Sequence, residues 1–177
     1  MRKLKTSEIQ RLSIEEFKNS RKIPLVVVLD NVRSLHNVGS VFRTADAFLT
    51  EKILLCGITG APPNAEIHKS ALGAEFSVDW QYFENTVDAI EMLKSQKFTV
   101  ISIEQAAGSI PLTAFKAERG TKYAVVFGNE VKGVQQQAVT MSDICLEVPQ
   151  FGTKHSLNVS VAAGIVIWEM FNLLNHL

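Results

Sequence analysis

Short runs of consecutive hydrophobic residues alternate along the chain with segments in which hydrophobic residues recur every three or four positions. The runs are rich in Val, Ile and Leu, which favours buried β-strands, whereas the longer periodic segments favour helices. We expect strands at residues 24–30, 52–57, 98–104, 123–128 and 144–149, and a weaker one at 74–80. We expect helices at residues 6–19, 38–49, 86–96 and 135–141, and over the hydrophobic carboxyl-terminal segment.

Six continuous hydrophobic strands separated by helices predict an α/β fold, in which one mostly parallel six-stranded sheet carries helices on both faces. A chain of 177 residues is long enough to bury such a core without disulfides or metals. No internal repeat or low-complexity linker interrupts the alternation. We therefore interpret residues 23–177 as one domain, preceded by a basic helical extension at residues 1–22.

The net charge is zero, but it is unevenly distributed. Residues 1–22 contain seven Lys or Arg and three acidic residues, a net charge of +4, which leaves −4 on the remainder. A basic arm of this kind can contact a phosphate backbone. A solvated helix whose lysine side chains lie along the protein surface is the alternative.

The remaining composition narrows the class of protein. Hydrophobic residues make up 46% and charged residues 20%, which is typical of globular proteins in water. Cys56 and Cys145 share no metal-type spacing with histidine or with each other, so we expect reduced thiols in the cytoplasm and no metal site. The amino terminus lacks a signal peptide, and the hydrophobic run at residues 159–168 is too short to span a membrane.

In parallel sheets, ligands bind beyond the carboxyl ends of the strands, which directs attention to three loops. The helix after the first loop has Asn37 in the position of an N-cap. Arg43 lies on the side of this helix away from its hydrophobic stripe. That stripe consists of Val38, Val41, Phe42, Ala45, Phe48 and Leu49. Arg43 is therefore either a solvated arginine or one directed at a phosphate or a reacting hydroxyl.

The second loop, FGNEVKGV at residues 127–134, contains two glycines that permit close approach of a ligand to the backbone. It matches neither the phosphate-binding loop nor the dinucleotide fingerprint. The third loop precedes the last helix, which Ser156 or Asn158 can cap. Capping explains only one of these two polar residues. The helix is hydrophobic on all sides, so it must be buried within the fold or in a twofold contact between copies.

Three segments resemble, in order and spacing, the motifs of the SpoU-type RNA methyltransferases of the SPOUT superfamily. They are NVGSVFR at 37–43, FGNEVKGV at 127–134 and VPQFGTKHSLNVSVAAGI at 148–165. The segment HKSALGAEFSVDW at 68–80 is similar to the central region of the family. Two residues depart from the family pattern: Val131 stands where glycine is usual, and Gln150 stands where methionine is usual.

The resemblance implies a deep trefoil knot in the carboxyl-terminal part of the chain, a rare exception to the rules of chain connection. It also implies that S-adenosylmethionine binds in the knot and that its methyl group is transferred to a ribose 2′-hydroxyl of RNA. We expect tRNA as the first candidate substrate, with rRNA as the open alternative. The resemblance further implies a homodimer with its active site near the subunit boundary.

Carried over by position, the resemblance assigns two groups of residues. The residues that match the catalytic set of the family are Asn37, Arg43, Glu130, Ser156 and Asn158. The residues that match the positions holding the adenosyl group are Gly128, Val148 and Leu157.

Two other functions remain open at this point. An RNA-binding protein without catalytic activity is compatible with the departures at Val131 and Gln150. A serine hydrolase using Ser156 and His155 is disfavoured, because adjacent residues on a helix do not face each other and no nucleophile-elbow motif is present.

Overall fold

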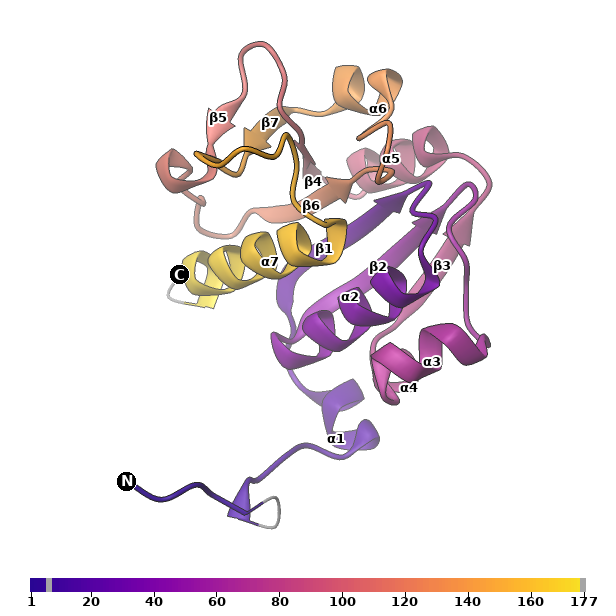
Figure 1. Cartoon of the computed structure of the whole chain (residues 1–177), viewed down its shortest axis with the longest axis vertical. Coiled ribbons are helices and arrows are strands. Elements are labelled where there is room, and N and C mark those ends of the chain that lie inside the picture. Colours follow the sequence, from indigo (N-terminus) through magenta and orange to yellow (C-terminus); the bar gives the residue numbers. More distant parts are fainter. Residues whose placement is uncertain (6–7, 176–177) are drawn as a thin grey trace.

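The computed structural model describes residues 1–5 and 8–175, which form a twisted sheet covered by helices on both faces (Figure 1). The strands are β1 (Ile23–Asp30), β2 (Thr50–Cys56), β3 (Trp80–Phe83), β4 (Phe98–Ile103), β5 (Ile110–Pro111), β6 (Lys122–Phe127) and β7 (Ile144–Glu147). Their order in the sheet is β3-β2-β1-β6-β4-β7-β5, and every strand pair is parallel. The prediction of a parallel α/β sheet is confirmed, but the sheet has seven strands rather than six.

The helices are α1 (Ile14–Asn19), α2 (Leu35–Ala47), α3 (Ala65–Ala71), α4 (Ala74–Ser77), α5 (Thr86–Ser95), α6 (Gln136–Met141) and α7 (Val159–Asn175). The central strand β1 is buried on both faces, and its side chains alternate between two cores. Leu25, Val27 and Leu29 pack with α2 and α7 on one face, where α1, α3 and α4 also contribute buried residues. Val26 and Val28 pack with α5 and α6 on the other face.

One predicted strand was wrong, and α3 and the seventh strand were not predicted, because local pattern did not show how the chain packs. Residues 74–77, expected to open a strand, form α4, and the strand begins only at Trp80. Gly73, at φ 97°, makes the turn before α4, and the Ser77 hydroxyl then donates to Asp46 of α2. The seventh strand, β5, is two residues long and therefore has no detectable hydrophobic period.

The predicted amino-terminal helix is shorter than expected. Helix α1 begins at Ile14, after a capping box in which the Ser13 hydroxyl accepts from the Glu16 amide and the Glu16 carboxylate accepts from the Ser13 amide. Residues 6–7 of the predicted helix lie outside the described residues. Phe17 is the buried residue of α1 and joins the core beneath α2.

The parallel order brings the carboxyl ends of β1, β6, β4 and β7 together at one edge of the sheet (Figure 1). The loops that leave β4, β6 and β7 therefore meet, although they are far apart in the sequence. Among the described residues, no helix combines the length and the hydrophobicity needed to cross a bilayer.

Candidate active site

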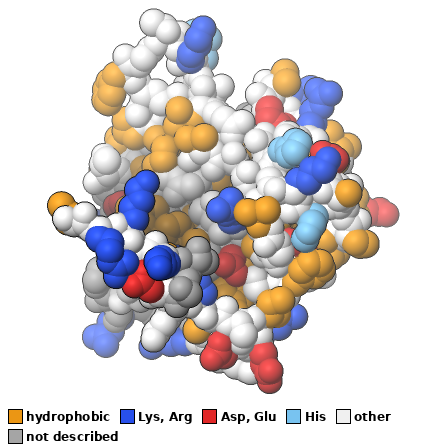
Figure 2. All heavy atoms as spheres, turned by 60° about the horizontal axis from the view of Figure 1, so that its bottom comes forward, with side chains coloured by type: hydrophobic (Ala, Val, Ile, Leu, Met, Phe, Trp, Pro, Cys, Tyr) orange, Lys and Arg blue, Asp and Glu red, His pale blue; other side chains and the backbone are white. Residues whose placement is uncertain are grey.

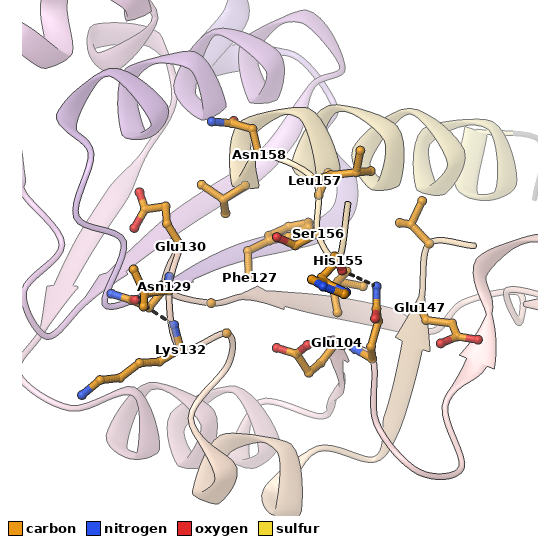
Figure 3. Close-up of a pocket in the computed structure, with 18 of the residues that line it drawn as sticks. Glu104, Phe127, Asn129, Glu130, Lys132, Glu147, His155, Ser156, Leu157 and Asn158 are labelled. Atoms are coloured by element: carbon orange, nitrogen blue, oxygen red, sulfur yellow. Dashed lines mark hydrogen bonds between the residues drawn. The ribbon is translucent and has the colours of Figure 1, made fainter. Parts of the chain in front are cut away.

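A cavity of about 520 Å³ lies at the carboxyl ends of β4, β6 and β7 (Figure 3). Its walls come from the loops that follow these three strands and from the first turn of α7. The volume is within the range of small-molecule and cofactor pockets, and the position is where open parallel sheets bind ligands.

Three of the expected site residues form one hydrogen-bonded cluster at the edge of this cavity. The Asn37 side-chain amide donates to Glu130 Oε1 at 3.1 Å. Asn158 Nδ2 in turn donates to Asn37 Oδ1 at 3.2 Å. The cluster joins the start of α2, the loop after β6 and the start of α7, and in Figure 3 the side chains of Glu130 and Asn158 both point toward α2.

Glu130 also accepts two backbone hydrogen bonds from the start of α2. The amides of Arg33 and Ser34 donate to its two carboxylate oxygens, each at 3.0 Å. Partial burial by itself raises the pKa of Glu130, but the bonds from Arg33, Ser34 and Asn37 outweigh burial and lower the pKa below its ordinary value. Glu130 is therefore ionised at neutral pH, and its oxygens accept from the start of α2 and from Asn37, so it stabilises the helix terminus.

The predicted N-cap role of Asn37 was wrong. The N-cap of α2 is Ser34, whose hydroxyl accepts from the Asn37 amide at 3.3 Å, so Asn37 lies in the first turn with its side chain free to reach the cluster. At the third loop, capping by Asn158 is confirmed, because its Oδ1 accepts from the Ser160 amide at 2.9 Å. Ser156 does not cap α7; it lines the cavity.

The loop after β6 folds back on itself so tightly that Gly128 cannot be replaced without a shift. A Cβ atom on Gly128 would lie 2.0 Å from the Val134 amide nitrogen and 2.1 Å from the Gly133 carbonyl carbon. Gly133, at φ 68°, completes the turn. Val131 is not in the left-handed region, and its amide donates to Asn129 Oδ1 at 2.9 Å, so the backbone here does not require the glycine usual in the resembling family.

The structure brings most, but not all, of the expected residues to the cavity. Gly128, Val148 and Leu157 line it together with Glu130, Ser156 and Asn158. Arg43 is exposed on the outer side of α2, about 9 Å along the helix axis from Asn37. Its predicted position opposite the hydrophobic stripe is confirmed, but it does not line the cavity of its own chain.

Sequence reasoning missed a second polar group in the cavity. Glu104 Oε2 accepts from the Val134 amide at 2.8 Å, and Glu104 Oε1 accepts from the Gln105 amide at 2.9 Å. Gln105 Nε2 donates to the His155 carbonyl at 3.1 Å, the contact dashed in Figure 3. Both residues follow β4 directly, so the rule that ligands bind at strand ends could have found them.

A buried carboxylate supports the same loops from below. Asp30, at the end of β1, accepts from the Gln135 amide at 2.8 Å and from the Gln135 side chain and the Thr86 hydroxyl at 2.7 Å. The start of α6 is thereby fixed to the central strand. Within residues 1–5 and 8–175, no group of three or more His, Cys, Asp or Glu side chains is placed to hold a metal ion.

Residues 24–168 match the model of the SpoU rRNA Methylase family. A tRNA (guanosine(18)-2′-O)-methyltransferase of Thermus thermophilus is 30% identical over 163 residues, which is 92% of this chain and 82% of that protein. A 23S rRNA (guanosine-2′-O-)-methyltransferase of Escherichia coli is 30% identical over 146 residues. That match covers 82% of this chain but only 59% of the relative, so this chain spans less than two thirds of the rRNA enzyme.

Solved structures show the same fold. The AdoMet-bound rRNA methyltransferase from Sinorhizobium meliloti superposes with a TM-score of 0.79 at 27% identity, over 92% of this chain and 61% of that chain. The TrmH/SpoU tRNA modifying enzyme of A. aeolicus superposes with a TM-score of 0.81 at 24% identity, over 92% and 81% of the two chains.

Proposed function

Because the chain belongs to the SpoU rRNA Methylase family, we propose that it methylates a ribose 2′-hydroxyl of tRNA. As a member of this family, it is an RNA 2′-O-methyltransferase that uses S-adenosylmethionine. The choice of tRNA is supported by the similarity to the Thermus thermophilus tRNA enzyme over 92% of this chain. The observation that carries the proposed active site is the Glu130–Asn37–Asn158 cluster, which unites three distant motifs beside one cavity.

The cavity fits the cofactor in its size, in the charge of its walls and in the backbone groups that line it. S-adenosylmethionine carries a sulfonium and an ammonium against one carboxylate, so a cavity with carboxylates suits it. Glu104 and Glu130 both line the cavity, whereas the Lys132 side chain extends away from it (Figure 3). Gly128, Val148 and Leu157 would hold the adenosyl group, largely through the backbone. The absence of a Cβ atom at Gly128 lets Gly133 and Val134 pack directly against it, which shapes this part of the cavity wall.

The cofactor supplies an electrophilic methyl group on sulfur, so the protein has to orient the ribose hydroxyl and help remove its proton. Asn37 and Asn158 fix the wall beside the reacting hydroxyl, and Glu130 keeps that wall in place as an acceptor that is ionised at neutral pH. Ser156, which lines the cavity (Figure 3), is a further donor and acceptor for the substrate.

Arg43 acts on a hydroxyl or phosphate of the RNA. In a homodimer, its side chain reaches the cavity of the other protomer. The supporting observations are its exposure on α2 and its distance from its own cavity. Helix α2 lies beside α7, as the Phe48 and Trp168 ring centroids 5.2 Å apart indicate, and α7 has an exposed hydrophobic side. A second copy packed on α7 would place Arg43 of one protomer near the cavity of the other.

Three further features belong to the proposal. Residues 1–22 form a basic extension that contacts RNA phosphates, and residues 23–177 form the methyltransferase domain. In Figure 2, Lys and Arg side chains gather near the amino-terminal end of the chain. The chain forms a trefoil knot in its carboxyl-terminal part. Strand β7 lies beside β4, on the side away from β6, and the chain then returns across the sheet to place α7 against β1 and α2. Its location is the cytoplasm, where its RNA substrate is found.

Methyl transfer can be measured with labelled S-adenosylmethionine and, separately, tRNA and rRNA from a strain lacking the gene. Mass spectrometry of the digested RNA should then show one 2′-O-methylated nucleoside, in tRNA. Label in rRNA alone would replace tRNA by rRNA as the substrate. RNA binding without methyl transfer would identify an RNA-binding protein that has lost catalysis.

A further inference from the structure

The Glu104 carboxylate is fixed by the backbone on two sides. The Val134 amide donates to one oxygen at 2.8 Å, and the Gln105 amide donates to the other at 2.9 Å. A Cβ atom on Gly133 would lie 2.1 Å from Glu104 Oε2, so glycine at this position makes room for the carboxylate. Such a pinned carboxylate keeps one orientation without a cofactor present.

The other carboxylates of the cavity are directed elsewhere. Glu130 is occupied by the start of α2 and by Asn37. The Glu147 side chain points away from the cavity in Figure 3, while Glu104 points from the end of β4 toward the loop after β6. Among the described residues that line the cavity, Glu104 is thus the carboxylate available to a ligand in the part formed by β4 and β6.

Glu104 lies on the side of the cavity where the proposed function places the adenosyl group. Val134 and Gly133, which contact the Glu104 carboxylate, are also the residues against which Gly128 packs. The Glu104 amide donates to the Leu146 carbonyl at 3.0 Å, which puts Glu104 beside the strand that leads to Val148. The cluster of Asn37, Glu130 and Asn158, where the reacting hydroxyl is expected, is a separate group.

We propose that the Glu104 carboxylate binds the two ribose hydroxyls of the S-adenosylmethionine adenosyl group. An ionised carboxylate has about four lone-pair sites, and the Val134 and Gln105 amides use one on each oxygen. One acceptor site on each oxygen remains for a pair of neighbouring hydroxyls, as in the acidic residue that holds a ribose in dinucleotide-binding folds. This inference rests on the proposed function for the identity of the cofactor.

The test compares two ligands and two proteins by isothermal titration calorimetry. The ligands are S-adenosylhomocysteine and its 2′,3′-dideoxy analogue, and the proteins are the wild type and Glu104→Gln. The wild type should bind the ribose form about 10-fold more tightly, the usual effect of a hydrogen bond to a charged group. Glu104→Gln should weaken the ribose form by about 10-fold and the dideoxy form much less, so that the preference for ribose nearly disappears.

Equal weakening of both ligands by Glu104→Gln would overturn the proposal, because it is the result for a residue that only supports the loop. Equal affinity of the wild type for the two ligands would overturn it even if the variant did not fold. Glu147→Gln, with the same chemical change on a side chain that points away, should keep the ribose preference. Methyl transfer to RNA by the wild type is measured in parallel, so loss of this subsite can be told apart from failure of the proposed function.

Discussion

Among the expected catalytic residues, Arg43 lies outside both the cavity and the cluster of Asn37, Glu130 and Asn158 beside it. Its side chain is exposed and away from the hydrophobic stripe of α2, so its replacement should disturb neither the core nor the cofactor pocket. Arg43→Ala should abolish methyl transfer and leave S-adenosylmethionine affinity within about 3-fold, as for an interaction made mainly in the transition state. Single-turnover kinetics and calorimetry measure the two quantities.

Arg43→Lys should not restore activity, because lysine offers a point charge where arginine offers a planar fork of donors. Ser40→Ala is the matched control, since Ser40 lies on the same side of α2 and its hydroxyl donates within the helix to the His36 carbonyl. Near-normal turnover by Arg43→Ala would remove Arg43 from the proposed mechanism.

Glu130 has a pKa below its ordinary value in the folded protein, so its contribution to stability depends on pH in a known direction. The contribution is complete above the unfolded pKa of about 4.5 and is lost as the pH falls through the lower folded pKa. Because Glu130 is exposed, the effect should be less than about 1 kcal/mol. Glu130→Gln should melt below the wild type at pH 7, and this difference should shrink below about pH 4.5.

Melting temperatures from pH 7 to pH 3 give this comparison. The control is Glu91→Gln on α5, an exposed glutamate at the other face of the sheet. A wild-type minus Glu130→Gln difference that stays constant over the whole range would mean that the carboxylate does not hold the start of α2.

At the scale of elements, the amino-terminal segment consists of two parts with different roles. Phe17 of α1 belongs to the core, so a deletion that includes α1 would damage the fold. Residues 1–12 carry four Lys or Arg and one Glu, and their basic side chains are exposed where described. Their deletion should weaken tRNA binding and reduce the slope of log affinity against log salt by about 0.7 to 0.9 for each phosphate that these side chains neutralise.

Affinities measured at several salt concentrations give this slope. A variant with Lys97→Gln and Lys116→Gln removes exposed charges elsewhere and should keep the wild-type slope. If deletion of residues 1–12 also leaves the wild-type slope unchanged, this segment is solvated and does not contact RNA.

At the scale of the whole molecule, α7 has one side buried and one side uncovered. Val159, Ala163, Val166, Ile167 and Met170 lie in the core. Val161, Ile165 and Trp168 are 51%, 39% and 50% exposed, so burial within one chain does not cover the helix. A hydrophobic patch of this kind favours a twofold contact between copies.

Val161→Glu should therefore convert a dimer into monomers and reduce methyl transfer together, because charge would be buried in the contact. Sedimentation velocity at micromolar concentration measures the first effect. Ile58→Glu, which places the same charge on another exposed hydrophobic residue, should leave the dimer intact. A fully active wild-type monomer at this concentration would contradict the proposed homodimer.

The sequence by itself determined the elements with a long and regular hydrophobic pattern. It predicted β1, β6, α2 and α5 to within a few residues, and it placed Arg43 opposite the buried stripe of its helix. It also directed attention to the strand-end loops that form the cavity. These features are local, because hydrophobic period and turn residues act over a few positions along the chain.

Only the tertiary structure decided which polar side chains meet. Asn37 and Glu130 are 93 residues apart in the sequence, and Asn37 and Asn158 are 121 apart, yet the sheet order brings all three together. The sequence pattern could not show whether Asn37 is the N-cap of α2 or lies in its first turn, because the residue at which a helix begins depends on packing. Glu104 carried no motif, and its importance came from the Val134 amide that the fold places beside it, because hydrogen bonds depend on distance in space.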